Sequence, residues 1–127
     1  MNHIQIHELQ TIHWDSHPEL FIPEGKYIRP QFTVIPSRQR TGIRIRWTYR
    51  YYSNEKLVLS FIAEQDIIIE SIDSLTIKSL AAIIWECWPF FKGEFLKRTK
   101  EESNLAGLAE FDLSNQQLQE FLLFLKE

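Results

Sequence analysis

The sequence has no apolar run that approaches the roughly 20 residues a membrane helix requires. Segment 1–14 lacks the basic beginning, apolar centre and small-residue cleavage site of a secretory signal. Cysteine is nearly absent, because Cys87 is the only one, and this excludes an internal disulfide framework. A strong charge is missing too, since a formal net charge of -3 gives no overall electrostatic reason to bind polyanions. Together these absences predict a soluble protein in a reducing, cytoplasmic setting.

The chain does contain enough apolar material for one core. Its 127 residues, of which 44% are hydrophobic, suffice for a domain that buries about two-thirds of its unfolded surface. A second domain would be left without a core. Residues 1–127 are therefore predicted to form a single domain.

The most informative stretch is 43–70, where two alternating segments flank a short polar turn. Large apolar residues occupy most odd positions and charged residues many even ones, which is the period-2 pattern of half-buried strands. In the hairpin alignment Arg46 faces Glu64. The same alignment pairs Arg44 with Asp66. These opposite charges favour the register that puts the large odd-numbered side chains on one core face.

Two further strands are expected before this hairpin. Segment 2–14 reads as a strand with a bulge near His7 and Glu8, because its apolar pattern changes parity there. After a loop that contains prolines, segment 27–36 resumes as a strand whose own two prolines suit an edge. With the hairpin, these segments predict a four-stranded antiparallel sheet, made of an N-terminal strand, a long first crossover loop and a meander.

Helical spacing replaces the alternation after the hairpin. Apolar residues between Ile77 and Phe95 predict a long helix that Asp73 or Ser74 caps. Pro89 lies inside this pattern and predicts a kink or a break.

A short helix is expected at residues 114–126, where Ser114 and Gln117 form a capping-box pair. Segment 105–109 reads as a small-residue connection to it. The predicted fold class is α+β, with both helices packed on one face of the sheet.

The long helix is apolar nearly all round from Leu80 to Phe91, which is typical of a helix buried on two sides. One side can cover the sheet, and the other needs a second surface. Self-association through the helix layer, as a homodimer or homotetramer, is the favoured explanation. Coverage by the short C-terminal helix is the alternative.

The sequence offers little catalytic chemistry. His13, Asp15 and His17 alternate and would share one face of a strand, but surface histidines explain them better than a metal site. Cys87 lies in the most apolar part of the long helix and reads as a core residue rather than a nucleophile. No phosphate loop, serine motif or spaced carboxylate pair is recognisable, so we expect neither an enzyme nor a cofactor or metal site.

Arginines on the sheet favour the main alternative function, a domain that binds single-stranded nucleic acid or a small ligand. The basic residues concentrate on one part of the predicted sheet: Arg38, Arg40, Arg44, Arg46 and Arg50. Stacking platforms need aromatic residues on the same face, whereas the aromatic residues here have the opposite parity. A solvated, salt-bridged sheet face is the favoured interpretation.

The order of the elements resembles the SecB family of export chaperones. Segment 12–18, followed by Phe21, Tyr27 and Pro30, resembles the family's first strand and crossing loop, and segment 88–94 resembles the proline, aromatic and basic-acidic pattern of its long helix. The resemblance spans almost the whole chain and depends on pattern and order rather than on a diagnostic motif.

The resemblance implies an ATP-independent holdase that keeps an unfolded polypeptide or preprotein in apolar grooves, for export or for control of a toxin-antitoxin system. It also implies a translocase motor or a toxin-antitoxin protein as a partner, and a homo-oligomer. The residues expected to bind the client are aromatic or apolar: Trp14, Phe21, Ile22, Tyr27, Trp85, Trp88 and Phe91. For the helical members of this set, a place in the core is the favoured interpretation.

Overall fold

The computed structural model describes residues 4–20, 27–38, 41–99 and 107–127. Seven strands, two α-helices and two short 3-10 turns are assigned within these ranges. They are β1 (Ile4–Ile6), β2 (Gln10–Ser16), η1 (Pro18–Leu20), β3 (Tyr27–Ile28), β4 (Gln31–Pro36), β5 (Gly42–Ser53), β6 (Lys56–Ile69), η2 (Ile72–Ser74), α1 (Ile77–Thr99), β7 (Gly107–Leu108) and α2 (Asn115–Leu125). The fold is α+β, as predicted.

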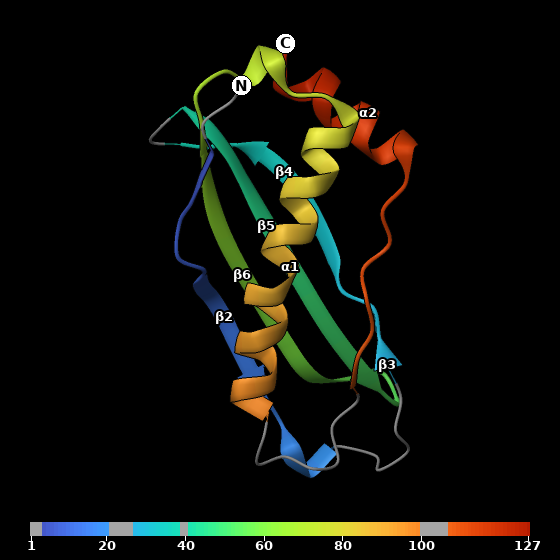
Figure 1. The fold of residues 1–127 in the computed structure, drawn as a ribbon. Coiled ribbons are helices and arrows are strands. Elements are labelled where there is room, and N and C mark those ends of the chain that lie inside the picture. Colours follow the sequence, from blue (N-terminus) through green and yellow to red (C-terminus); the bar gives the residue numbers. More distant parts are fainter. Residues whose placement is uncertain (1–3, 21–26, 39–40, 100–106) are drawn as a thin grey trace.

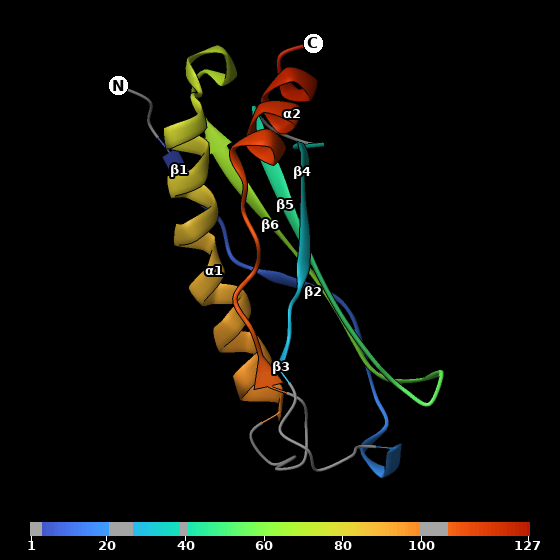
Figure 2. The ribbon, with the colours of Figure 1, turned by 90° about the vertical axis from the view of Figure 1, so that its right-hand side faces the viewer.

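An antiparallel sheet forms one layer, and α1 lies across one of its faces (Figure 1). The strand order is β1, β6, β5 and β4, with β2 also paired to β6. Helix α2 lies near the start of α1, and Figure 2 shows α1 as the outermost element on its side of the sheet. No helix in the described part of the chain is long and apolar enough to cross a membrane.

The β5–β6 hairpin has the predicted register. Arg44 pairs with Asp66, and Arg46 pairs with Glu64. The turn between the strands consists of Asn54 and Glu55, both with positive φ, as the tightest hairpin turns require. The odd-numbered residues of β5 from Ile43 to Tyr51 are buried, as expected for the core face.

The core lies between this odd face and the inner side of α1. Trp47 is fully buried at its centre, and its ring stacks on Phe91 with centroids 5.5 Å apart. Phe61 stacks on the same phenylalanine at 4.8 Å, and Tyr49 packs on Phe95 at 4.8 Å. Aromatic side chains on β5, β6 and α1 therefore hold the two layers together.

The N-terminal strand is two strands rather than one, so the prediction of a four-stranded sheet is corrected to five. The pairing with β6 slips by one residue across 7–9, where the bulge was predicted, and again between Thr11 and His13. These slips let both apolar segments of the irregular N-terminal pattern pair with the long regular strand β6.

Segment 27–36 is also divided. Only β4 joins the main sheet, at its edge, while β3 pairs in parallel with β7. Segment 105–109 is thus wrongly predicted as a connection alone, because Gly107 and Leu108 form a strand. This pairing joins parts of the chain that are far apart in sequence, and local patterns carry little information about it.

One prediction about the start of α1 is wrong. Thr76 and Ser79 satisfy each other's backbone N–H groups with their hydroxyls, so the start is capped by Thr76 rather than by Asp73 or Ser74. At Pro89, where a kink or a break was predicted, the helix has no break. At α2, by contrast, the predicted capping box of Ser114 and Gln117 is confirmed.

Gly42 is the glycine whose lack of a side chain the fold requires. It has φ of 155°, and a Cβ there would lie 2.1 Å from the carbonyl oxygen of Ile67. We expect Gly42→Ala to lower the free energy of unfolding by about 2–3 kcal/mol, because backbone on β6 would have to move. Urea denaturation of the dilute chain would measure this.

Gly93→Ala is the matched control, since a Cβ on Gly93 would meet nothing within 4 Å. In an exposed helix this change should raise stability by about 0.5–1 kcal/mol. Equal effects of the two substitutions would contradict the close approach at Gly42.

Candidate functional site

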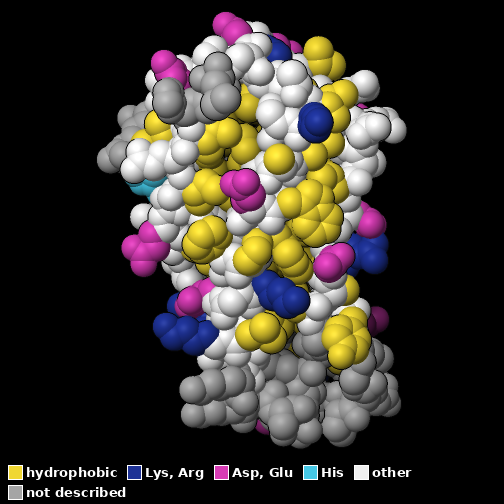
Figure 3. All heavy atoms as spheres, in the orientation of Figure 1, with side chains coloured by type: hydrophobic (Ala, Val, Ile, Leu, Met, Phe, Trp, Pro, Cys, Tyr) yellow, Lys and Arg dark blue, Asp and Glu magenta, His cyan; other side chains and the backbone are white. Residues whose placement is uncertain are grey.

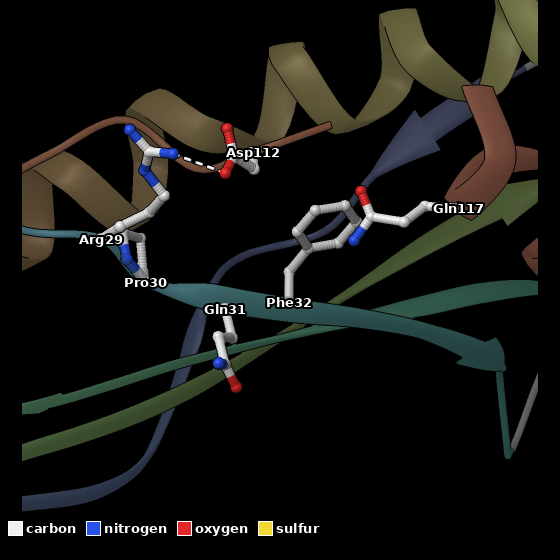
Figure 4. A pocket seen from close by; sticks show the side chains of 6 residues that line it. All are labelled: Arg29, Pro30, Gln31, Phe32, Asp112 and Gln117. Carbon is white, nitrogen blue, oxygen red and sulfur yellow. Dashed lines mark hydrogen bonds and ion pairs between the residues drawn. The ribbon is translucent and has the colours of Figure 1, made fainter. Parts of the chain in front are cut away.

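A depression of about 410 Å³ lies where β4 meets the segment that leads into α2 (Figure 4). Arg29 precedes β4, and its guanidinium donates a hydrogen bond to the carboxylate of Asp112. Phe32 on β4 and Gln117 on α2 point toward one another. Gln117 is held there by its capping-box bonds to Ser114.

Aromatic rings lie under this depression. The ring of Phe32 packs edge-on against Phe111 with centroids 5.4 Å apart, and it lies 5.7 Å from Phe121. Phe111 is buried and also contacts Trp85 on α1 at 4.4 Å. The site therefore offers aromatic rings, one ion pair and the side-chain amides of Gln31 and Gln117.

Those predicted client-binding residues that the structure describes lie in different parts of the fold. Trp14 lies half-buried on β2, and Tyr27 lies on β3, on the other side of α1 in Figure 1. Trp88 is 5% exposed and Phe91 is fully buried, so both belong to the core. Trp85 is 43% exposed. Phe21 and Ile22 lie outside the described residues.

Trp14 is already engaged by its neighbours. It packs edge-on against Phe61 at 5.2 Å, and the guanidinium of Arg98 lies 5.3 Å from its ring centroid. Arg98 is in turn bonded to Glu94. By contrast, Tyr27 is 74% exposed and is the most accessible predicted client contact among the described residues.

Large apolar side chains remain uncovered on the helix layer, and Figure 3 shows them spread along α1. Six large apolar residues of α1, α2 and β3 are at least 43% exposed: Tyr27, Trp85, Phe90, Leu96, Leu123 and Phe124. The prediction that the long helix has a second apolar side is thus confirmed. Leu96 was missed as a site residue, although its helical spacing from Trp85 and Pro89 is visible in the sequence.

A second depression, of about 520 Å³ and mostly apolar, lies between the start of α1 and α2. Ile77, Leu122 and Leu123 line it together with Lys126. The ammonium of Lys126 donates a hydrogen bond to the carbonyl of Leu75, which ties the end of α2 to the turn before α1. An apolar groove of this kind can accept a hydrophobic side chain from outside.

The arginine-bearing sheet face is salt-bridged, as the sequence predicts. Arg44 donates hydrogen bonds to Asp66 at 2.9 and 3.0 Å, and Arg46 donates to Glu64 at 2.9 Å. Glu64 is 5% exposed but the side chain of Arg46 is 41% exposed, so these charges compensate one another in a partly buried setting. Two of the five arginines are therefore occupied by carboxylates and less available to a polyanion. Arg40 lies outside the described residues.

The histidine cluster does not assemble a metal site. His17 lies 3.2 Å from the carboxylate of Asp15 and 3.6 Å from that of Glu19. His13 is exposed on β2. No group of three metal-ligating side chains that could hold an ion is found among the described residues.

Comparison with known proteins identifies no relative: no family model matches the chain, and no curated protein or solved structure matches it significantly.

Burial makes Cys87 a poor nucleophile, and the apolar environment raises the pKa of its thiol to about 12. We expect the folded protein to react with a thiol-specific disulfide reagent many-fold more slowly at pH 8 than the chain in denaturant. A rapid native reaction would show that α1 opens and exposes this position.

The ion pairs give a pH-dependent stability. Because Arg44 and Asp66 are partly exposed, we expect Arg44→Gln to lower the free energy of unfolding by only about 1–2 kcal/mol near neutral pH. The hydrogen bond from Arg44 lowers the pKa of Asp66 below its ordinary 3.8. This contribution is therefore present above about pH 4 and is lost as the pH falls through the pKa of the folded state. The difference from wild type should shrink in urea titrations below that pH.

Arg50→Gln is the control for this substitution, because Arg50 is exposed on the same strand and the same face. It should change stability by less than about 0.5 kcal/mol at any pH. A constant difference between wild type and Arg44→Gln down to about pH 2 would contradict the assigned role of Asp66.

Proposed function

We propose that this chain is an ATP-independent chaperone of the holdase type, which binds unfolded polypeptides or preproteins in the cytoplasm as a homodimer or homotetramer. The observation that carries the proposal is the set of exposed large apolar side chains on the helix layer and β3. A folded domain rarely leaves so many uncovered unless they bind something. The sequence resemblance to the SecB family supports the same function.

Client binding is assigned to the surface around β3 and the depression of Figure 4. Tyr27 is exposed beside it, and Phe32 supplies a ring within it. Aromatic side chains give large contact area at little conformational cost and recognise no particular sequence, which suits a binder of unfolded chains. Phe21 and Ile22 stay predicted members of this surface.

The remaining members of the predicted site have different roles in this proposal. Trp88 and Phe91 stabilise the layer from within, while Trp85 faces outward and serves self-association. Trp14 contributes its exposed part at the opposite edge. The clients are either preproteins awaiting export, delivered to a translocase motor, or components of a toxin-antitoxin system.

Tyr27→Ala tests the client surface. We expect it to weaken suppression of aggregation of a chemically unfolded client about three- to tenfold, since one aromatic contact contributes about 0.5–1.5 kcal/mol. Light scattering of the client during dilution from denaturant would measure this. Suppression should vary little with salt, whereas binding to a polyanion would weaken steeply.

Ile4→Ala is the control, because Ile4 is 41% exposed on β1, which pairs with β6 on the side of the sheet away from β4. It should leave suppression unchanged. If wild-type protein fails to suppress aggregation, the holdase proposal is wrong. If both substitutions act equally, client binding does not occur at β3.

A further inference from the structure

Segment 107–113, here called the strap, runs from β7 to the beginning of α2. It contains no helix and passes between α1 and β4, as Figure 2 shows. Exposure alternates at its middle, because Phe111 is 4% exposed while its neighbours Glu110 and Asp112 are exposed. Proteins bind extended peptides in this way, with main-chain pairing and a pocket for an alternate side chain. The strap thus lies on the domain like a short peptide with one buried anchor.

The anchor lies among four aromatic rings from other parts of the fold, here called the aromatic cage. The ring centroid of Phe111 is 4.4 Å from that of Trp85 and 5.2 Å from that of Trp88, both on α1. Trp47 on β5 lies at 5.1 Å, and Phe32 on β4 lies at 5.4 Å. Aromatic contacts of this kind depend on area and ring geometry, so the cage suits any aromatic side chain that reaches it.

One member of the aromatic cage keeps an unsatisfied polar group. The indole N–H of Trp47 is buried and has no hydrogen-bond partner within the described part of the chain. The phenyl ring of Phe111 offers no acceptor, so docking of the strap leaves this donor without the bond it makes to water in the unfolded chain. Another occupant that brings an acceptor to the cage can satisfy it.

Few contacts hold the strap beside β3. The β3–β7 pair extends over two residues, and one further main-chain bond joins the N–H of Ala109 to the carbonyl of Ile28 at 3.0 Å. The side chains of the Arg29–Asp112 ion pair are 54% and 80% exposed, and exposed pairs add little stability. Segments with few buried contacts open more readily than the core does.

We propose that the strap is a built-in competitor of the client. Phe111 occupies the aromatic cage until the strap lifts away from β3, and an aromatic side chain of an unfolded polypeptide then takes its place. This inference rests on the proposed holdase function and adds a regulatory step to it. Phe32 lines both the cage and the depression of Figure 4, so a client can reach one from the other. The fraction of molecules with an open strap limits the apparent affinity, because only the open form is competent.

A reversible disulfide tests whether the strap must open. Ile28 and Leu108 are partners in the β3–β7 register, so cysteines at both positions are close enough to form a disulfide. The oxidised double variant, Ile28→Cys with Leu108→Cys, should require about tenfold more protein than its reduced form for half-maximal suppression of client aggregation, because the lock lowers the competent fraction. Light scattering of a client without cysteines would measure this. Reductant should leave the wild type unchanged, since its one cysteine is buried.

Phe111→Ala removes the competitor and keeps the aromatic cage. It should lower the amount of protein needed about threefold, whereas a purely structural role predicts weaker suppression. Ile69→Ala is the control for lost core packing, because Ile69 is fully buried on β6, where it pairs with β1 at the side of the sheet away from β4. This control should not improve suppression. Circular dichroism at the assay temperature shows whether both variants remain folded.

Hydrogen exchange at the amide of Ala109 separates the strap from the chaperone proposal. If the strap opens by itself, this amide exchanges faster than the core amides of β6 in the absence of any client. Exchange only through global unfolding overturns the strap inference, whether or not the protein is a holdase.

The suppression assays separate the two proposals in the other direction. Equal suppression by the oxidised and reduced forms, or an improvement by Ile69→Ala as large as that by Phe111→Ala, overturns the strap inference and leaves the holdase proposal standing. A strap that opens in a protein that never protects a client contradicts the holdase function, and the competition with it.

Discussion

The structure depends on burying the odd-numbered face of the β5–β6 hairpin under α1. Trp47, Phe61 and Phe91 stack in the middle of this contact, and each fully buried large apolar side chain contributes roughly 1.5–3 kcal/mol. The register of the hairpin decides which face is apolar, because a slip of one residue would turn every such side chain to the other face. The ion pairs of Arg44 and Arg46 with Asp66 and Glu64 on the opposite face hold that register.

A single helix across a broad sheet leaves part of itself uncovered, and this links the fold to the proposals. The inner side of α1 is buried in the core, while α2 lies beside the start of the helix and Phe111, in the segment before α2, contacts Trp85. The outer side keeps Phe90 and Leu96 half exposed. Core packing and the proposed surface for self-association are therefore two sides of the same helix. The exposed Tyr27 and the depression beside β4 lie elsewhere and can serve another partner.

Features encoded by local sequence patterns were predictable. Features that depend on which of several polar side chains caps a helix, or on pairing between distant segments, were not. The capping box at Ser114 involves only residues three apart, and the sequence pattern identifies it. The start of α1 has several polar candidates, and the reciprocal bonds of Thr76 and Ser79 prevail over Asp73 and Ser74. Pro89 removes one helical hydrogen bond, but core contacts of the surrounding turns hold the helix continuous.

The sequence by itself determined the hairpin, its charged and apolar faces, the two helices and the excess of apolar residues on the long one, because alternation and helical spacing act between near neighbours. Only the tertiary structure decided that β3 pairs with β7, that the N-terminal strand divides in two, and which aromatic residues are buried. Trp85 and Trp88 are three residues apart and equally apolar, yet one is 43% exposed and the other 5%. The direction in which a helix meets its sheet sets that difference, and it arises from contacts across the whole chain.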